Sequence, residues 1–145
     1  MVDVSGPAGR AGIERMDRAE CLALLEAEDV GRLAVVQGNM PAIFPVNYLL
    51  DGEDIVFRSA PGTKVAHGAD SSAAFEIDHL DRAERRGWSI VATGHLEVVD
   101  PRDDALARLR QLPIRPWAAG DKDIVMRLVV GTITGRVLGG PDEGA

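Results

Sequence analysis

Two short turn sequences constrain the fold of this 145-residue chain more than any other feature. Gly38-Asn39 and Asp51-Gly52 are typical of two-residue β-hairpin turns, and they join three apolar runs at residues 30–37, 40–50 and 55–57. Parallel strands need a long crossover between them, usually a helix, and two residues leave no room for one. The sequence therefore predicts antiparallel β-structure.

Three later apolar runs, at residues 73–77, 88–99 and 124–138, bring the expected total to about six strands. Gly94 predicts a bulge or a close backbone approach. Pro41 and Pro45 cannot donate hydrogen bonds to a sheet, so their strand is expected to be an edge or to bulge there. The charged segment 78–86 is expected to be a solvated turn. Together these features predict a mostly β barrel with short α-helices.

The first short helix is expected to follow Asp17, which has the residue type of an N-cap, with Glu20 in the capping-box position. Its apolar stripe includes Cys21, and it ends near Glu28. No neighbouring base accompanies Cys21 in the sequence, so we expect a buried apolar group and not a nucleophile.

Two more short helices are expected, one around residues 63–67 and one that begins with Asp100 as N-cap and Pro101 as its first residue. Pro113 would stop the second of these. The chain shows no internal repeat. We therefore expect one domain over residues 13–138, flanked by a flexible N-terminal segment, 1–12, and a flexible C-terminal tail, 139–145.

Composition and charge exclude several classes of protein. The chain is 46% hydrophobic, which is not a disordered composition, and its net charge of −7 argues against general nucleic-acid binding. The single cysteine fits a reducing compartment. No apolar run approaches the length of a membrane span, and the N-terminus lacks the apolar core of a signal peptide. We therefore expect a soluble, cytoplasmic protein.

A group of hydrogen-bond donors surrounds the Pro61-Gly62 break. Arg58 and Ser59 end a predicted strand, and Thr63 and Lys64 follow where a short helix is expected to start. Helix starts also offer unpaired backbone N–H groups and the positive end of the helix dipole. The pattern predicts a site for the phosphate of a cofactor; the alternative is an ordinary solvated corner.

The order and spacing of several motifs resemble the flavin-binding split β-barrel proteins that are related to pyridoxamine 5′-phosphate oxidase. The resemblance covers residues 17–137. It rests on Pro45-Val46-Asn47-Tyr48, Ile55-Val56-Phe57-Arg58-Ser59, Pro61-Gly62-Thr63-Lys64, Gly87-Trp88-Ser89, Arg115-Pro116-Trp117 and Thr134-Gly135-Arg136.

The resemblance implies a six-stranded antiparallel split β-barrel of Greek-key type, and a homodimer with FMN bound at the subunit interface. It assigns the cofactor phosphate to Arg58, Ser59 and Lys64, with Thr63 as a plausible addition. The flavin ring would lie along Pro45, Val46, Asn47 and Tyr48. The partner subunit would cover the ring, and the candidates for this are Trp88, Ser89 and Trp117.

The function that this resemblance implies is an FMN-dependent oxidoreductase that acts on a small, unidentified electrophile. A bound flavin carries the redox chemistry, so no catalytic side chain is required, and the three histidines do not form a metal pattern. A deazaflavin cofactor would need a wider basic groove; beyond the Arg58 and Lys64 corner, only Arg127 or Arg115 could supply one. The alternatives are a deazaflavin-dependent reductase, a flavin-binding carrier or sensor without turnover, and a cofactor-free dimeric barrel.

Overall fold

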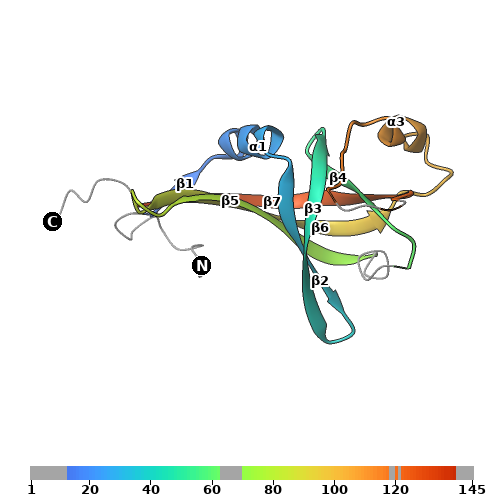
Figure 1. Ribbon diagram of the computed structural model, residues 1–145, viewed down its shortest axis with the longest axis horizontal. Helices are drawn as coiled ribbons and strands as arrows, with labels where there is room; N and C mark the ends of the chain where they lie inside the picture. The colour runs from blue at the N-terminus through green and yellow to red at the C-terminus, as the bar shows by residue number, and fades with distance from the viewer. Residues whose placement is uncertain (1–12, 63–69, 118–119, 121, 140–145) are drawn as a thin grey trace.

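The computed structural model describes residues 13–62, 70–117, 120 and 122–139. Within these residues a sheet of seven strands carries two helices (Figure 1). In chain order the elements are β1 (Ile13–Met16), α1 (Arg18–Ala27), β2 (Val30–Gln37), β3 (Met40–Asp51), β4 (Asp54–Ser59), β5 (Ser71–Asp81), β6 (Arg86–Val98), α3 (Leu106–Arg110) and β7 (Ile124–Leu138).

Six of the strands pair in a closed antiparallel ring. The strands β2, β3 and β4 form one three-stranded unit, and β5, β6 and β7 form the other. Pairing of β2 with β5 and of β4 with β7 closes the ring. The ring confirms the predicted six-stranded antiparallel barrel. The short strand β1 pairs with β7 outside the ring and was not predicted.

The hairpin turn at Gly38-Asn39 is confirmed, whereas the second turn lies one residue later than predicted, at Gly52 and Glu53 between the paired residues Asp51 and Asp54. Gly38 and Gly52 have φ of 58° and 63°, the left-handed region that glycine adopts without strain. Strand β3 pairs with β2 along its first half and with β4 only from Tyr48 onward. The half that contains Pro41 and Pro45 therefore has one neighbouring strand, which confirms the predicted edge.

Gly94 marks an irregularity in the pairing of β6 with β7. The register shifts between Thr93 and Gly94, so that Gly131 of β7 has no partner in the ladder. A Cβ atom at Gly94 would collide with the backbone carbonyl of Val129. Both observations confirm the predicted bulge and close backbone approach.

The prediction of a solvated turn at residues 78–86 is wrong in its first half. Strand β5 continues to Asp81, and β6 starts at Arg86, so the turn is shorter than expected. Asp78 lies opposite Ser89, and Asp81 lies opposite Arg86. The long partner strand holds this charged segment in the sheet, whereas local composition favoured a loop.

The expected N-cap at Asp100 is also wrong. Helix α3 begins at Leu106, and Ala105 precedes it without a side-chain cap. The carboxylates of Asp100 and Asp103 instead accept hydrogen bonds from the backbone N–H groups of Arg102 and Ala105, two residues further on. These local bonds stabilise turns in place of a first helical turn. The helix expected at residues 63–67 lies outside the described residues.

The main core fills the ring of strands, and α1 packs over one end of it. Asp17 caps α1 as predicted, since its carboxylate accepts a hydrogen bond from the Glu20 N–H at 2.8 Å. Cys21 and Leu25 of this helix are buried in the main core, which confirms the expectation for Cys21. Burial is the largest cause that raises the pKa of the Cys21 thiol.

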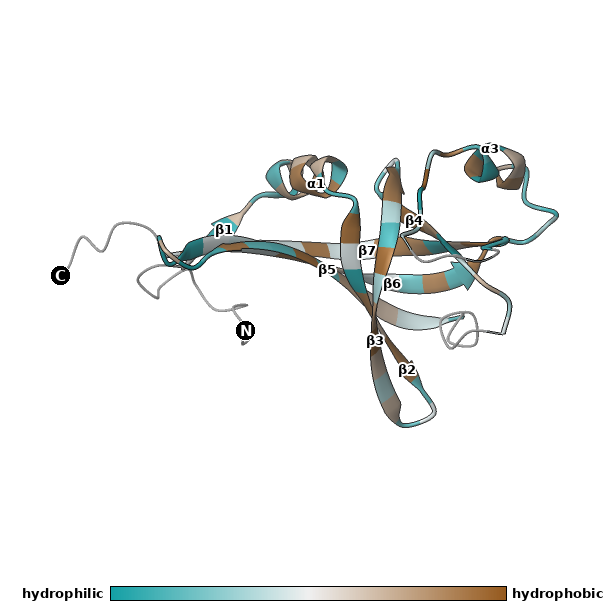
Figure 2. Ribbon diagram, viewed as in Figure 1, coloured by the Kyte–Doolittle hydropathy of each residue, from teal (hydrophilic) through white to brown (hydrophobic). Residues whose placement is uncertain are grey.

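A smaller core lies under α3, where buried side chains of β4 and β7 meet the helix and the segment that follows it. The hairpin of β2 and β3 projects from the body of the molecule and carries apolar residues toward its tip (Figures 1 and 2). None of the helices in the described part of the chain combines the length and the apolar character that a membrane crossing needs.

Candidate functional site

Arg58 lies near the end of β4, opposite Val125 of β7. Its side chain leaves the strand on the same face as Val56, which packs under α3. One terminal nitrogen, Nη2, donates to the carbonyl of Arg110 at the end of α3. Within the described residues, the Arg58 Nε is buried and has no hydrogen-bond partner. This guanidinium therefore has a donor that an oxyanion can satisfy.

Ser59, the next residue along β4, is buried, and its side chain leaves the strand on the opposite face. Its hydroxyl lies 3.4 Å from the carbonyl oxygen of Ala60, to which it donates. The side chains of Arg58 and Ser59 thus approach a common ligand only beyond the strand end. Thr63 and Lys64, the other two predicted phosphate ligands, lie outside the described residues.

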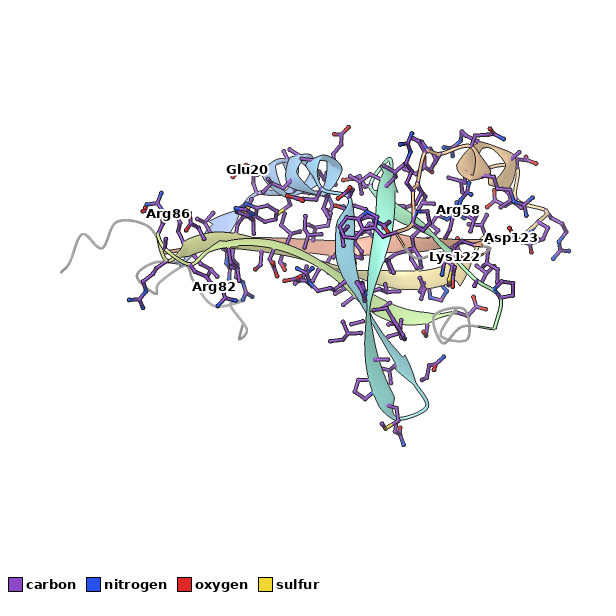
Figure 3. All side chains as sticks on the ribbon, in the orientation of Figure 1. Glu20, Arg58, Arg82, Arg86, Lys122 and Asp123 are labelled. Atoms are coloured by element: carbon purple, nitrogen blue, oxygen red, sulfur yellow. The ribbon has the colours of Figure 1, made fainter. Side chains whose placement is uncertain are left out.

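Lys122 is a cation at this end of the molecule that the sequence did not single out. Ile124 lies opposite Ser59, and Lys122 precedes Ile124 by two residues. Figure 3 shows Arg58 and Lys122 at the same end of the molecule, with Arg82 and Arg86 at the other. The residues are far apart in the sequence, and only the pairing of β4 with β7 brings Lys122 to this corner.

Asn47 and Trp117 are brought together with Arg58. Tyr48 pairs with Phe57, so Asn47 and Arg58 flank this pair as cross-strand neighbours on the outer face of the hairpin. The Asn47 Oδ1 accepts a hydrogen bond from the Trp117 backbone N–H at 2.9 Å. The Trp117 side chain is 80% exposed. Three predicted site residues from three separate segments therefore meet on one surface.

The other candidates on β3 divide between the two faces of the strand. Pro45 is exposed on the same outer face as Asn47, whereas Val46 and Tyr48 point into the main core. The Tyr48 hydroxyl donates to the carbonyl of Leu25 at 2.5 Å, and its ring meets Phe75 edge-on. Burial raises the pKa of the Tyr48 phenol strongly. The Tyr48 side chain therefore packs in the main core and does not face the proposed cofactor site.

Trp88 and Ser89 lie far from Arg58 within one chain. Trp88 lies opposite Val137 of β7, whereas Arg58 lies opposite Val125. The twelve residue steps between these positions span roughly 40 Å of extended strand. Trp88 and Ser89 can approach a cofactor at Arg58 only from a second copy of the chain, so their assignment stays a prediction.

Two other arginines, Arg127 and Arg108, already have ion-pair partners. Arg127 binds Glu97 at 2.6 Å and Asp103 at 3.0 Å, and its side chain is only 17% exposed. Arg108 binds Asp51 at 2.7 Å, and this hydrogen bond lowers the pKa of the Asp51 carboxyl. Because these carboxylates already neutralise its charge, Arg127 does not contribute to the wider basic groove that a deazaflavin would need.

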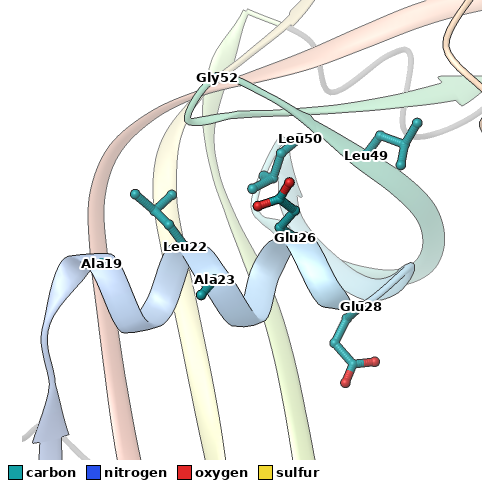
Figure 4. A pocket seen from close by; sticks show the side chains of 8 residues that line it. All are labelled: Ala19, Leu22, Ala23, Glu26, Glu28, Leu49, Leu50 and Gly52. Carbon is teal, nitrogen blue, oxygen red and sulfur yellow. The ribbon is translucent and has the colours of Figure 1, made fainter.

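A separate groove of about 560 Å³ lies between α1 and the end of β3 (Figure 4). Leu22, Leu49 and Leu50 line it, together with the carboxylates of Glu26 and Glu28. No cationic side chain is among its lining residues in the described part of the chain. Repulsion by the two carboxylates makes this groove a poor site for a phosphate.

A closed ring of six antiparallel strands with short covering helices defines the class of the split β-barrel proteins. Residues 17–137 match the family described as pyridoxamine 5′-phosphate oxidase, and the chain belongs to this family.

Three relatives each align with most of this chain. The uncharacterized protein Rv0080 of Mycobacterium tuberculosis is 34% identical over 138 residues, which are 90% of this chain and 89% of that protein. The structure of the FAD binding protein from Mycobacterium smegmatis superimposes with a TM-score of 0.76 at 32% identity, covering 88% of this chain and 99% of that one. A conserved protein of unknown function from Corynebacterium diphtheriae gives 0.74 at 31% identity, covering 88% and 98%.

Proposed function

We propose that this protein is a flavin-dependent oxidoreductase that binds FMN and acts on a small electrophile. The observation that carries the proposal is the buried, unsatisfied Nε of Arg58, within the described residues, beside Asn47 and Trp117. A buried guanidinium donor without a partner calls for an explanation, and a bound anion supplies one. When bound, the flavin supplies the transfer of hydride or electrons.

In this proposal the side chains of the corner hold the phosphate. Arg58 donates from its Nε, and Lys122 adds a positive charge from the start of β7. Ser59 and the predicted ligands Thr63 and Lys64 complete the group. Charge-assisted hydrogen bonds of this kind contribute roughly 1.5–3 kcal/mol each.

The ring of the flavin would lie over Pro45 and Asn47 on the outer face of β3. Asn47 keeps its amide nitrogen for the ring, because its oxygen already accepts from the Trp117 backbone. The exposed indole of Trp117 offers an aromatic surface at the same place. These groups would orient the ring and exclude water from one of its faces.

FAD is the second candidate for the cofactor. The solved structure from Mycobacterium smegmatis is that of an FAD binding protein, and it covers most of this chain at 32% identity. Arg115 is exposed and precedes Trp117 by two residues, so it is the candidate for a second phosphate. Separate titrations with FMN and FAD distinguish the two cofactors.

A second copy of the chain is proposed to cover the outer face of the barrel. The hairpin of β2 and β3 exposes Met40 by 72% and Ile43 by 69%. A mainly apolar groove of about 610 Å³ lies between this hairpin and strands β5, β6 and β7. An apolar arm beside an apolar groove suits a reciprocal contact between two copies, and exposed apolar surface of this extent marks an interaction site. The lone, buried Cys21 further suits a cytoplasmic location.

Flavin binding is tested by titrating the purified protein with FMN and with FAD while flavin fluorescence is followed. We expect Arg58→Ala to weaken the preferred flavin by about tenfold or more. The matched control is Arg102→Ala, since Arg102 is an exposed arginine that pairs with Asp100 in its own loop. Circular dichroism checks that both variants fold. Equal affinity of Arg58→Ala and wild type would place the phosphate elsewhere.

Turnover is tested separately on the flavin-loaded protein. NADH, NADPH and a reduced deazaflavin are offered as electron donors without oxygen, and reoxidation by small acceptors follows. Reduction and reoxidation support the oxidoreductase. A tightly bound flavin that no donor reduces would favour a carrier or sensor.

A further inference from the structure

The groove between α1 and the end of β3 takes no part in the proposed flavin site. It is lined by Ala19, Leu22, Ala23, Glu26, Glu28, Leu49, Leu50 and Gly52 (Figure 4). Its volume of about 560 Å³ lies in the range of ordinary ligand pockets, roughly 300–1,000 Å³. Helix α1 lies on one side of the sheet, and the tip of the β2–β3 hairpin projects on the other (Figure 1). The proposed contact between two copies of the chain through that hairpin therefore leaves the groove accessible.

The floor of the groove is apolar. Leu22 and Leu50 pack against the main core and Leu49 against the smaller core, but all three side chains remain partly exposed. Ala19 and Ala23 lie one helical turn apart on the exposed face of α1. Small side chains at these positions let another helix approach closely, since the distance between packed helices depends on the side chains at the contact. The floor therefore suits the apolar stripe of a second helix.

Charge is distributed unevenly along the groove. At the start of α1, next to Ala19, Arg18 binds Glu53 at 2.9 Å, so the charges at this end are paired. Glu26 and Glu28 line the groove near the other end of the helix, and neither forms an ion pair with a residue that the structure describes. The uncompensated negative charge of the groove therefore lies at the C-terminal end of α1.

The helix dipole adds to the charge of these carboxylates. The C-terminal end of a helix carries about half a negative charge, which favours cationic side chains in the last turn. The last turn of α1 contains no basic residue, and Glu26, Glu28 and Asp29 lie in it or directly after it. This arrangement does not stabilise α1 by itself. A cation from another molecule would relieve the repulsion and would interact favourably with the helix end.

Charge and burial argue against two other occupants of the groove. The carboxylates repel the anionic headgroups of a membrane surface, as they repel a phosphate. A second copy of the chain would have to offer a basic amphipathic helix. In the described part of the chain, α3 carries Arg108 and Arg110, but its apolar residues Leu106 and Leu109 are buried in the smaller core. The remaining occupant is a helix from a different protein.

We propose that the groove binds an amphipathic helix of a partner protein, with an apolar stripe on the three leucines and Lys or Arg side chains facing Glu26 and Glu28. In this mode of recognition, apolar anchors one helical turn apart enter the groove, and the flanking charges select the partner. A contact limited to one groove is smaller than a stable interface, so the complex is expected to be transient. The proposal does not depend on flavin binding.

Fluorescence anisotropy of labelled peptides tests the proposal on the full chain. Two designed helical peptides share one leucine stripe, which is flanked by lysines in the first peptide and by glutamates in the second. The wild-type protein is expected to bind the lysine peptide about tenfold more tightly, or better. Ala23→Gln places a longer side chain over the exposed floor and should weaken this binding by about tenfold. The double variant Glu26→Gln/Glu28→Gln should weaken it by about three- to tenfold, because two partly exposed ion pairs are lost.

Glu84→Gln is the matched control. It removes the same charge from the exposed turn between β5 and β6 and should bind the lysine peptide as the wild type does. Circular dichroism checks that all variants fold. The proposal is overturned if the lysine peptide does not bind, if both peptides bind equally, or if Glu84→Gln weakens binding as much as the double variant. It is also overturned if Ala23→Gln changes the sedimentation of the protein without peptide, because a second copy would then occupy the groove.

Discussion

Tyr48→Phe tests how the barrel holds α1. The Tyr48 hydroxyl donates to the Leu25 carbonyl at 2.5 Å, and both residues are buried. Leu25 lies in the last turn of α1, where carbonyls have no partner within the helix. Phenylalanine keeps the edge-on contact with Phe75 at 4.7 Å but leaves this carbonyl unpaired. An unsatisfied buried acceptor costs about 1–3 kcal/mol, so we expect the free energy of unfolding to fall by about 2 kcal/mol.

Urea unfolding followed by circular dichroism measures this change, with an unchanged slope showing that the two proteins expose the same surface. The matched control is Arg18→Ala. Arg18 also ties α1 to the hairpin of β3 and β4, through an ion pair with Glu53 at 2.9 Å, but both side chains are about half exposed. Exposed pairs contribute about 0–1 kcal/mol, so this variant should lose less than Tyr48→Phe. A loss below about 0.5 kcal/mol for Tyr48→Phe would refute the role given to the hydroxyl.

Three further changes test the core, the carboxyl group of Glu76 and the apolar hairpin of β2 and β3. A Cβ at Gly31 would collide with the Phe75 ring, so Gly31→Ala should lower the free energy of unfolding by about 1–3 kcal/mol in urea titrations; an equally stable variant would contradict the packing. The pKa of Glu76, which is raised mainly by burial, means that its contribution to stability is present below pH 4.5 and lost as the pH rises through about 7. Glu76→Gln should therefore gain stability relative to the wild type between pH 5 and 8, by about 1 kcal/mol after allowance for solvent screening, and a difference independent of pH would count against it. Ile43→Glu should convert the proposed dimer to a monomer in sedimentation experiments while Leu80→Glu, at another exposed apolar position, should not; a wild-type monomer would end the proposal.

Turn chemistry and apolar patterning predicted most of the barrel, because both act locally. The Gly38 and Gly52 turns fix which strands are neighbours, and Asp17 fixes the start of α1. The four residues of β1 carry no comparable signal, since their strand exists through pairing with the end of β7. Asp100 misled the prediction of α3, because an aspartate that can cap a helix can also close a turn on the residue two positions later.

The candidate site was predictable only where one hairpin supplies it. The turn between β3 and β4 sets the register that places Asn47 beside Arg58. Lys122 reaches the same corner through the pairing of β4 with β7, which joins segments that are far apart in the sequence.

Successive side chains of a strand point to opposite faces of the sheet, so two adjacent residues rarely contact the same ligand. Arg58 and Ser59 are neighbours in the sequence, but their side chains leave β4 on opposite faces. Val46 and Asn47 differ in the same way, and only Asn47 lies on the face of Arg58. Alternation along β3 and β4 therefore reduces the number of predicted side chains that can converge directly on the proposed phosphate corner.

The most direct measurement is the visible absorption spectrum of the purified protein after incubation with FMN or FAD and removal of free flavin by gel filtration. We expect flavin absorbance to elute with the wild-type protein and to be strongly reduced with Arg58→Ala. A wild-type protein that elutes without colour after exposure to both flavins would contradict flavin binding at the Arg58 corner.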